Sequence, residues 1–167
     1  MDIQTALDEG IFSLKKNCIE SAKLDAEILM SQIIKKDRKY IILNLKKSLS
    51  SDLYRNYKSL INVRSKGKPI AYLIKKKSFW KFDFKLNDEV LIPRPDTEII
   101  IEQALDVTKF KSKLRILDIG VGSGCILLSI LKERKNFRGV GIDISKKCTD
   151  ISKINTLNLG LNKRVKN

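Results

Sequence analysis

Histidine is absent from this sequence of 167 residues. Histidine is the commonest general base at neutral pH and the commonest metal ligand in proteins. Nucleophilic schemes that pair a serine or a cysteine with a histidine are therefore excluded within this chain. Any chemistry must depend on the positioning of reactants, or on a cofactor that brings its own reactive group. We expect no metal site and no histidine-assisted catalysis.

Cysteine is scarce, and long apolar runs are absent. The three cysteines, Cys18, Cys125 and Cys148, are widely spaced and form no CxxC pair, which argues against a zinc site or a disulfide framework. Reduced thiols are typical of a cytoplasmic protein. No run approaches the roughly 18 apolar residues that span a bilayer. The N-terminus also lacks the basic and apolar blocks of a secretion signal, so we predict a cytoplasmic protein without a membrane partner.

Acidic residues are outnumbered: 19 Asp and Glu stand against 34 Lys and Arg, for a net charge of +15. Such an excess can indicate a nucleic-acid partner. However, the adjacent lysines lie in separate segments and lack interleaved aromatic residues. These runs are Lys35-Lys36, Lys46-Lys47, Lys75 to Lys77 and Lys146-Lys147. We therefore predict a solvated basic surface with no specific nucleic-acid partner, and RNA binding that is weak, sequence-independent and salt-dependent.

The first part of the chain, residues 1–73, has apolar residues at helical spacing. The predicted inward positions are Ile3, Leu7, Ile11 and Leu14; then Leu24, Ile28, Leu29 and Ile33, following a cap at Ser21; and later Leu53, Tyr57, Leu60 and Ile61. Residues 40–45 suggest a further short helix, and Gly67 to Pro69 would end the last one. The pattern predicts a small bundle of four helices.

Residues 78–92 change to strand character. The stretch SFWKFDF alternates, and VLI follows after a turn predicted at residues 86–88. This pattern predicts a β-hairpin.

From Pro93 onward the pattern is that of a parallel α/β unit. Asp96 or Thr97 would start a helix that runs to Phe110, with its inward face at Ile99, Ile100, Ala104 and Leu105. Strands are then predicted at residues 114–119 and 139–142, with helices at 125–134 and 145–158. A third strand would begin near residues 163–165. Alternating strands and helices at this spacing predict a βαβ arrangement.

Three glycines follow the first of these strands. Gly120, Gly122 and Gly124 are spaced as GxGxG, and glycine allows both positive φ and close approach of a ligand to the backbone. The dinucleotide fingerprint GxGxxG needs its third glycine one residue later, where Cys125 stands. A dinucleotide-dependent oxidoreductase is therefore the weaker alternative.

Two acids accompany the glycines. Asp118 precedes the first glycine by two residues, and Asp143 ends the second strand, where an acid can accept hydrogen bonds from ribose hydroxyls. A ribose, a cationic portion and no phosphate describe S-adenosylmethionine, which we predict as the cofactor. Each acid taken alone could equally be an ordinary cap of a strand or a helix.

At this point the sequence resembles a known family. LDIGVGSGC, at residues 117–125, is similar to motif I of class I methyltransferases. GKPIAYLIKKKSFWKFDF, at 67–84, and VLIPRPDTE, at 90–98, resemble the linker of the PrmC or HemK family, the glutamine methyltransferases of peptide chain release factors. LDAEIL, at 24–29, also resembles that family's helical domain.

The resemblance implies an α/β protein with three segments. Residues 1–75 would be a helical bundle that docks the substrate, 76–95 a β-hairpin linker, and 96–167 the first βαβ part of a Rossmann-like domain that binds S-adenosylmethionine. The implied activity, in translation termination, is methylation of the glutamine side-chain amide in the GGQ motif of release factors. The implied cofactor residues are Asp118, Gly120, Val121, Gly122, Ser123, Gly124 and Asp143. The implied border of the pocket is Arg94, Pro95, Asp96, Thr97 and Glu98.

One departure from the family is large. Its catalytic motif is Asn-Pro-Pro-Tyr, which orients the substrate amide nitrogen, whereas none of the three prolines here follows an asparagine. We therefore assign no catalytic residue and expect a truncated, catalytically incomplete chain: an expression fragment, a split gene or a degraded gene. A second polypeptide could supply the remaining strands. The alternative is an inactive fragment whose bundle still binds a release factor or another protein.

Overall fold

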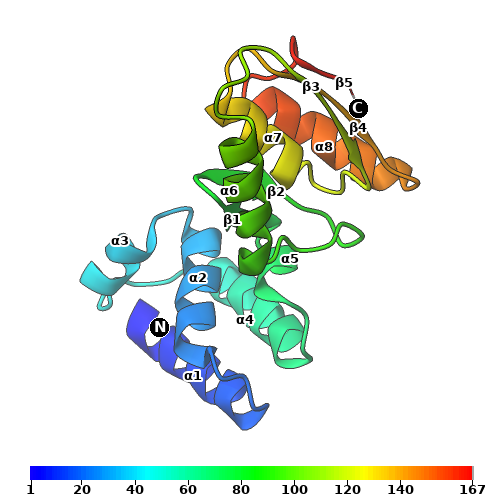
Figure 1. Cartoon of the computed structure of the whole chain (residues 1–167). Coiled ribbons are helices and arrows are strands. Elements are labelled where there is room, and N and C mark those ends of the chain that lie inside the picture. Colours follow the sequence, from blue (N-terminus) through cyan, green and yellow to red (C-terminus); the bar gives the residue numbers. More distant parts are fainter. Residues whose placement is uncertain (167) are drawn as a thin grey trace. The chain divides into compact units, whose positions relative to one another are not determined.

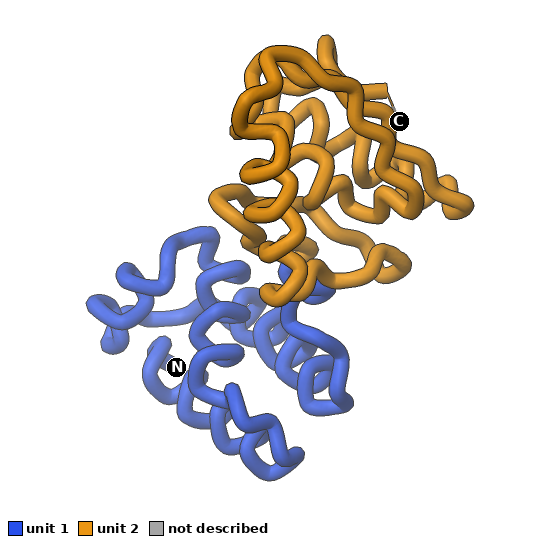
Figure 2. The backbone as a smooth tube through the Cα atoms, in the orientation of Figure 1, with its two compact units in different colours: residues 1–74 blue, residues 75–167 orange. Residues whose placement is uncertain are grey.

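The computed structural model describes residues 1–166 (Figure 1). The chain divides into two compact units, residues 1–74 and residues 75 onward (Figure 2). The predicted hairpin lies in the second unit, because its strands pack there and the unit begins at Lys75. The functional roles predicted for the three segments remain predictions.

The first unit is helical. Its helices are α1 (Ile3–Lys16), α2 (Ala22–Ile34), α3 (Arg38–Leu43), α4 (Ser51–Ser65) and α5 (Ile70–Leu73). The side chains of Asp2, Asp37 and Ser50 accept hydrogen bonds from backbone N–H groups three residues on, which satisfies donors that a helix start leaves unpaired. The four predicted helices are confirmed, and α5 was not predicted.

The inward face of α2 differs from the prediction. The exposed fraction of Leu24 is 44%, whereas Asp25 and Glu27 are only 2% and 5% exposed. Each buried carboxylate is paired with an arginine: Asp25 with Arg64 at 2.7 Å, and Glu27 with Arg38. An apolar periodicity cannot identify such positions, because a charge is tolerated inside only when a distant partner neutralises it.

The second unit contains strands, helices and one 3₁₀ turn. In chain order these are β1 (Lys76–Phe79), β2 (Phe82–Lys85), η1 (Pro95–Thr97), α6 (Glu98–Val107), β3 (Arg115–Ile119), α7 (Cys125–Glu133), β4 (Arg138–Ile142), α8 (Lys146–Asn158) and β5 (Val165–Lys166). β1 and β2 form an antiparallel hairpin, and β3, β4 and β5 form a parallel sheet in that order. The predicted fold class is therefore confirmed: a helical bundle, a hairpin and a parallel α/β arrangement.

The hairpin turns earlier than predicted. Its two-residue turn is Trp80-Lys81, and Trp80 has a φ of +56°. Glu98 accepts a hydrogen bond from the Trp80 backbone N–H at 2.7 Å, which supports this uncommon conformation. The predicted turn at 86–88 instead lies beyond β2, where Asn87 accepts hydrogen bonds from the backbone of Glu89 and Val90. The VLI stretch is not a strand.

The inward face of α6 also differs. Ile101 is fully buried, whereas Ile99 and Ile100 are 58% and 49% exposed. Because these three isoleucines are consecutive, the periodicity did not determine which of them faces the core. The helix also ends at Val107 rather than at Phe110.

The parallel sheet has one covered face. At Gly139 in β4, an added Cβ would lie 2.7 Å from a methyl carbon of Leu127 in α7, so helix and strand are in close contact there. The other face carries the side chains of Leu117 and Ile119, which are 59% and 76% exposed. In residues 1–166 no helix combines the length and the apolar character that crossing a membrane requires.

Candidate functional site

The glycine loop joins the end of β3 to the start of α7. Its three glycines all have positive φ: +82° at Gly120, +52° at Gly122 and +81° at Gly124. An added Cβ at Gly124 would lie 2.7 Å from Ser152 Oγ and 2.9 Å from Leu128 Cδ1. Gly124 is therefore required both by its backbone conformation and by its neighbours.

Asp143 holds this loop in place. Its Oδ2 accepts a hydrogen bond from Gly122 N at 2.9 Å, and its Oδ1 accepts one from Ser145 N at 2.9 Å. The N–H groups of Gly120 and Val121 both donate to the Ile142 carbonyl, at 2.8 and 2.9 Å. A carboxylate can accept about four hydrogen bonds, so each oxygen of Asp143 keeps capacity for a ligand. Its role in organising the loop was not evident from the sequence.

Asp118 is the half-buried acid of the same region. Burial raises the pKa of its carboxyl group, and the negative charge of Asp143 raises it further. Two carboxyl groups this close together would stabilise a ligand cation that lies beside them. The structure thus brings the two predicted acids and the glycine loop together.

Asn155 is a residue of this site that sequence reasoning missed. It lies in α8 and is 1% exposed. Its Oδ1 accepts from Lys85 N at 2.8 Å, and its Nδ2 donates to Lys85 O at 3.0 Å and to Ser123 O at 2.9 Å. One amide therefore connects the end of the hairpin to the glycine loop. A polar residue at an inward position of a predicted helix was the only available signal.

The predicted pocket border, residues 94–98, forms η1 and the start of α6. Arg94, Pro95 and Asp96 are exposed, and Thr97 and Glu98 are partly buried. The Glu98 carboxylate is occupied by the Trp80 N–H of the hairpin turn. The border role of this segment therefore remains a prediction.

The cysteine nearest the loop is not an activated nucleophile. Burial raises the pKa of the Cys125 thiol, with a smaller contribution in the same direction from Asp118. No group of three or more potential metal-ligating side chains occurs among the residues that the structure describes.

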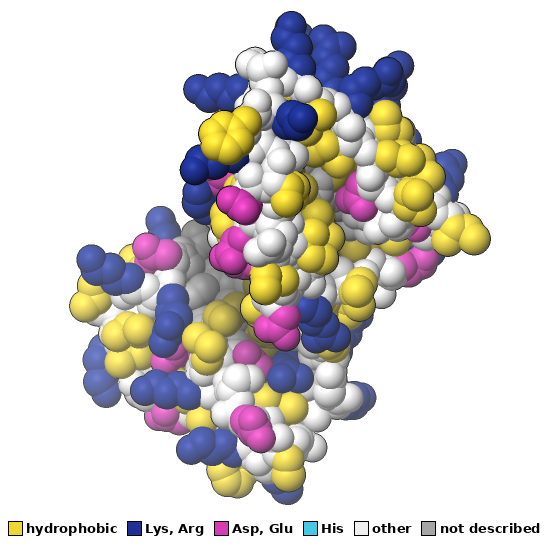
Figure 3. All heavy atoms as spheres, viewed as in Figure 1, with side chains coloured by type: hydrophobic (Ala, Val, Ile, Leu, Met, Phe, Trp, Pro, Cys, Tyr) yellow, Lys and Arg dark blue, Asp and Glu magenta, His cyan; other side chains and the backbone are white. Residues whose placement is uncertain are grey.

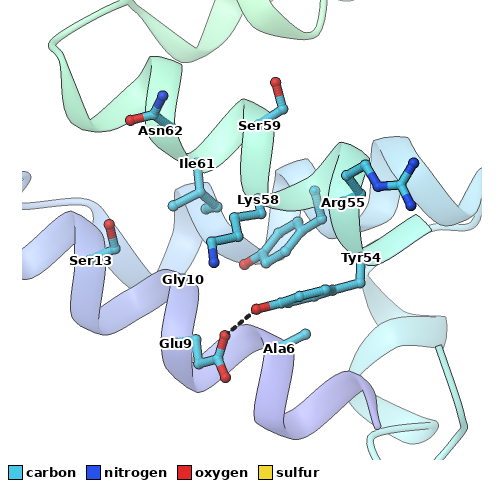
Figure 4. A pocket seen from close by; sticks show the side chains of 11 residues that line it. Ala6, Glu9, Gly10, Ser13, Tyr54, Arg55, Lys58, Ser59, Ile61 and Asn62 are labelled. Atoms are coloured by element: carbon cyan, nitrogen blue, oxygen red, sulfur yellow. Dashed lines mark hydrogen bonds between the residues drawn. The ribbon is translucent and has the colours of Figure 1, made fainter. Parts of the chain in front are cut away.

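A separate hollow of about 470 Å³ lies in the first unit, between α1 and α4 (Figure 4). Across it, the Tyr54 hydroxyl donates a hydrogen bond to Glu9 at 2.6 Å. The Tyr57 hydroxyl is buried against Gly10, where no Cβ could be accommodated. Because this hydroxyl is sealed from solvent, it does not by itself define a binding site.

Known proteins to which this chain is similar include release factor glutamine methyltransferases. Residues 5–74 match the family described as the PrmC N-terminal domain. A release factor glutamine methyltransferase of Clostridium acetobutylicum is 38% identical over 166 residues, which is 99% of this chain and 58% of that protein. A protein of the same name from Buchnera aphidicola subsp. Schizaphis graminum is 41% identical over 161 residues, or 96% of this chain and 58% of that protein.

Among solved structures, coclaurine N-methyltransferase bound to N-methylheliamine and SAH aligns with 98% of this chain and 48% of its own, at 15% identity and a TM-score of 0.39. That likeness is distant. The predicted resemblance to the release factor glutamine methyltransferases is confirmed by the sequence comparisons. The chain spans a little over half the length of these two relatives.

Proposed function

We propose that this chain is the cofactor-binding and docking part of an enzyme that methylates the glutamine side-chain amide in the GGQ motif of peptide chain release factors. The observation that carries the proposal is the glycine loop, held by Asp143 at the carboxyl end of parallel strands. In α/β sheets ligands bind at this end. The names of the relatives support the substrate.

The residues present suit S-adenosylmethionine, which would supply an activated methyl group. Asp143 would accept hydrogen bonds from the ribose hydroxyls with its remaining lone pairs. Asp118 would lie near the cationic methionine portion, whose charge would favour the ionised carboxylate and offset the raised pKa. Residues 120–124 would line the methionine portion, where the three glycines, all at positive φ, would let the backbone approach the ligand closely.

We further propose that the 167 residues alone do not complete the reaction. An amide nitrogen is a poor nucleophile because its lone pair is delocalised, so it must be held and oriented. The prolines of this chain are Pro69, Pro93 and Pro95, and none follows an asparagine. A second polypeptide that supplied such a motif would restore transfer of a labelled methyl group to a purified release factor.

The second candidate function is binding without catalysis. It rests on the match of residues 5–74 to the PrmC N-terminal domain, a segment that forms a helical bundle with its own hydrophobic core in this structure. In this case the first unit docks a release factor, and the glycine loop carries no ligand. Cofactor titration separates the two candidates.

The test is isothermal titration calorimetry of the whole chain with S-adenosylmethionine, with its demethylated product and with NAD. We expect binding of the first two and none of NAD. Asp143→Ala should weaken binding by about 1–3 kcal/mol, because it removes charged hydrogen bonds and releases the loop. Equal affinity for NAD would point to the dinucleotide alternative, and no binding of any ligand to a folded chain would favour the docking role.

A further inference from the structure

Three segments of the second unit, each a loop with the adjoining ends of its helix or strand, lead into the three parallel strands, and all three are rich in Lys and Arg. Residues 107–117 contain four cations and no acid, residues 132–138 four cations and one acid, and residues 161–166 three cations and no acid. Because β3, β4 and β5 run in the same direction, the segments that precede them meet at one end of the sheet, where the strands begin. Figure 3 shows Lys and Arg side chains gathered there, at the top of the view.

Backbone contacts between neighbouring strands hold these segments together. Arg138 N donates to Leu114 O at 3.0 Å, and Gly139 N donates to Arg164 O at 2.9 Å. Arg115 and Arg138 are direct partners in the β3–β4 register. Lys132 is also exposed, but its ammonium donates to Leu159 O. We refer to the other eight exposed cations of the three segments as the basic end: Lys109, Lys111, Lys113, Arg115, Lys135, Arg138, Lys163 and Lys166.

The charges of the basic end are not neutralised by acids of the described chain. Within residues 1–166, none of these cations forms an ion pair. Arg164 is different, because its guanidinium donates to the carbonyls of Leu131, Arg134 and Lys135 and so supports the turn before β4. Like charges that gather on one surface repel one another, so a bound polyanion would relieve this repulsion.

Two further features indicate the kind of polyanion. A hollow of about 400 Å³ lies among Arg115, Arg138, Lys163 and Lys166. In the loop that leads to β3, Phe110 is 92% exposed, and the Lys109 ammonium lies 5.6 Å from the centre of its ring. A basic groove together with an exposed aromatic ring is the combination by which proteins bind single strands, with cations along the phosphates and the ring under a base.

We propose that the basic end binds single-stranded RNA without sequence preference, through phosphate contacts of its cations and stacking of a base on Phe110. Duplex RNA offers no unstacked base to Phe110. An anionic membrane would attract the same cations, but the hollow bordered by arginines suits a phosphodiester chain better than a flat headgroup layer. This surface is not evident from runs of adjacent lysines, because the fold assembles it from three segments that are far apart in the sequence.

The test measures fluorescence anisotropy of a labelled oligouridylate of about 12 nucleotides titrated with the whole chain at several salt concentrations. The variant Lys111→Glu/Lys113→Glu should bind at least about tenfold more weakly, with a salt slope shallower by about 1.4, since each lost phosphate contact removes about 0.7. The matched control, Lys23→Glu/Lys39→Glu, makes the same change of net charge at exposed positions of the first unit. It should bind within about twofold of the parent chain.

A second pair of variants tests the stacking contact. Phe110→Ala should weaken single-strand binding about five- to tenfold and leave duplex binding unchanged. Phe12→Ala, which removes a 71%-exposed ring from α1, should change neither. All substituted side chains are exposed, and thermal melting verifies that each variant is folded.

Three results would overturn the proposal. Equal weakening by both charge variants would mean that only the net charge acts. An equal loss of affinity with Phe110→Ala and Phe12→Ala would show that no base stacks on Phe110. Binding to vesicles with anionic lipid, with no binding to the oligonucleotide, would assign the surface to a membrane instead.

Discussion

The two ends of the parallel sheet differ in charge and in how that charge is held. At the carboxyl end, Asp118 and Asp143 lie beside a loop of glycines, and the carboxylate of Asp143 is bound by two backbone N–H groups. At the amino end, the exposed cations lack ionic partners in the described chain, and they extend into solvent. In the first arrangement, hydrogen bonds within the protein fix the carboxylate of Asp143, whereas in the second the backbone is fixed by strand pairing and the charged side chains have no acidic partner. The carboxyl end is therefore suited to a small, specific ligand, and the amino end to a polymer.

The largest expected effect comes from a substitution in the glycine loop at the carboxyl end of the sheet. Gly124→Ala forces a Cβ against Ser152 Oγ and Leu128 at a φ of +81°. We expect a loss of about 2–4 kcal/mol in the free energy of unfolding, from strain and crowding together. Cofactor binding should be lost as well, because the loop cannot keep its shape.

The control for this substitution is Gly160→Ala. Gly160 also has positive φ, at +67°, but nothing lies within 4 Å of an added Cβ. It should cost only about 1 kcal/mol, because strain acts without crowding. Urea denaturation measures both variants. Equal losses would mean that the neighbours of Gly124 yield readily, and that the loop is less firmly organised than its contacts indicate.

The next effect tests whether Asn155 connects the hairpin to the loop. Asn155→Asp keeps the size of the side chain but removes the two donated bonds, to Lys85 O and Ser123 O, and buries a charge. We expect about 2–4 kcal/mol of destabilisation. Hydrogen exchange should increase together at residues 85–90 and 120–124, which are far apart in sequence.

Asn158→Asp is the matched control, since it makes the same change at an exposed position of the same helix. It should leave exchange at both segments unchanged. If Asn155→Asp accelerated exchange uniformly over the whole chain, Asn155 would only contribute to general stability and would not position the loop.

Much of the second unit could be predicted because strands and helices alternate with clear start signals, such as Ser145 before α8. Prediction failed where more than one residue could face inward, as at Ile99 to Ile101. It also failed where a contact distant in sequence decided the outcome, as with Asp25 and Arg64 or with the supported turn at Trp80. For the site, glycine spacing and the two acids were visible in the sequence. The hydrogen bonds by which Asn155 connects Lys85 to Ser123 were not visible, because these partners lie 70 and 32 residues away in the sequence.

The smallest expected effect concerns Asp118 and the pH dependence of the protein's stability. The pKa of Asp118 is raised by burial and by Asp143, so the folded state favours its protonated form more than the unfolded state does. The contribution of Asp118 to stability is therefore fully present at pH values below the ordinary range for aspartate, and it is lost as the pH rises through the raised pKa. Asp118→Asn removes this loss, and the thermal midpoint at neutral pH should rise by up to about 3 °C.

The same change should weaken the affinity for S-adenosylmethionine, because a neutral amide attracts the cationic portion less. Calorimetric melts from pH 3 to 8, with parallel titrations, measure both effects. A variant that is less stable at neutral pH, or that binds the cofactor unchanged, would show that Asp118 is an ordinary strand-end residue and that Asp143 alone defines the acidic end.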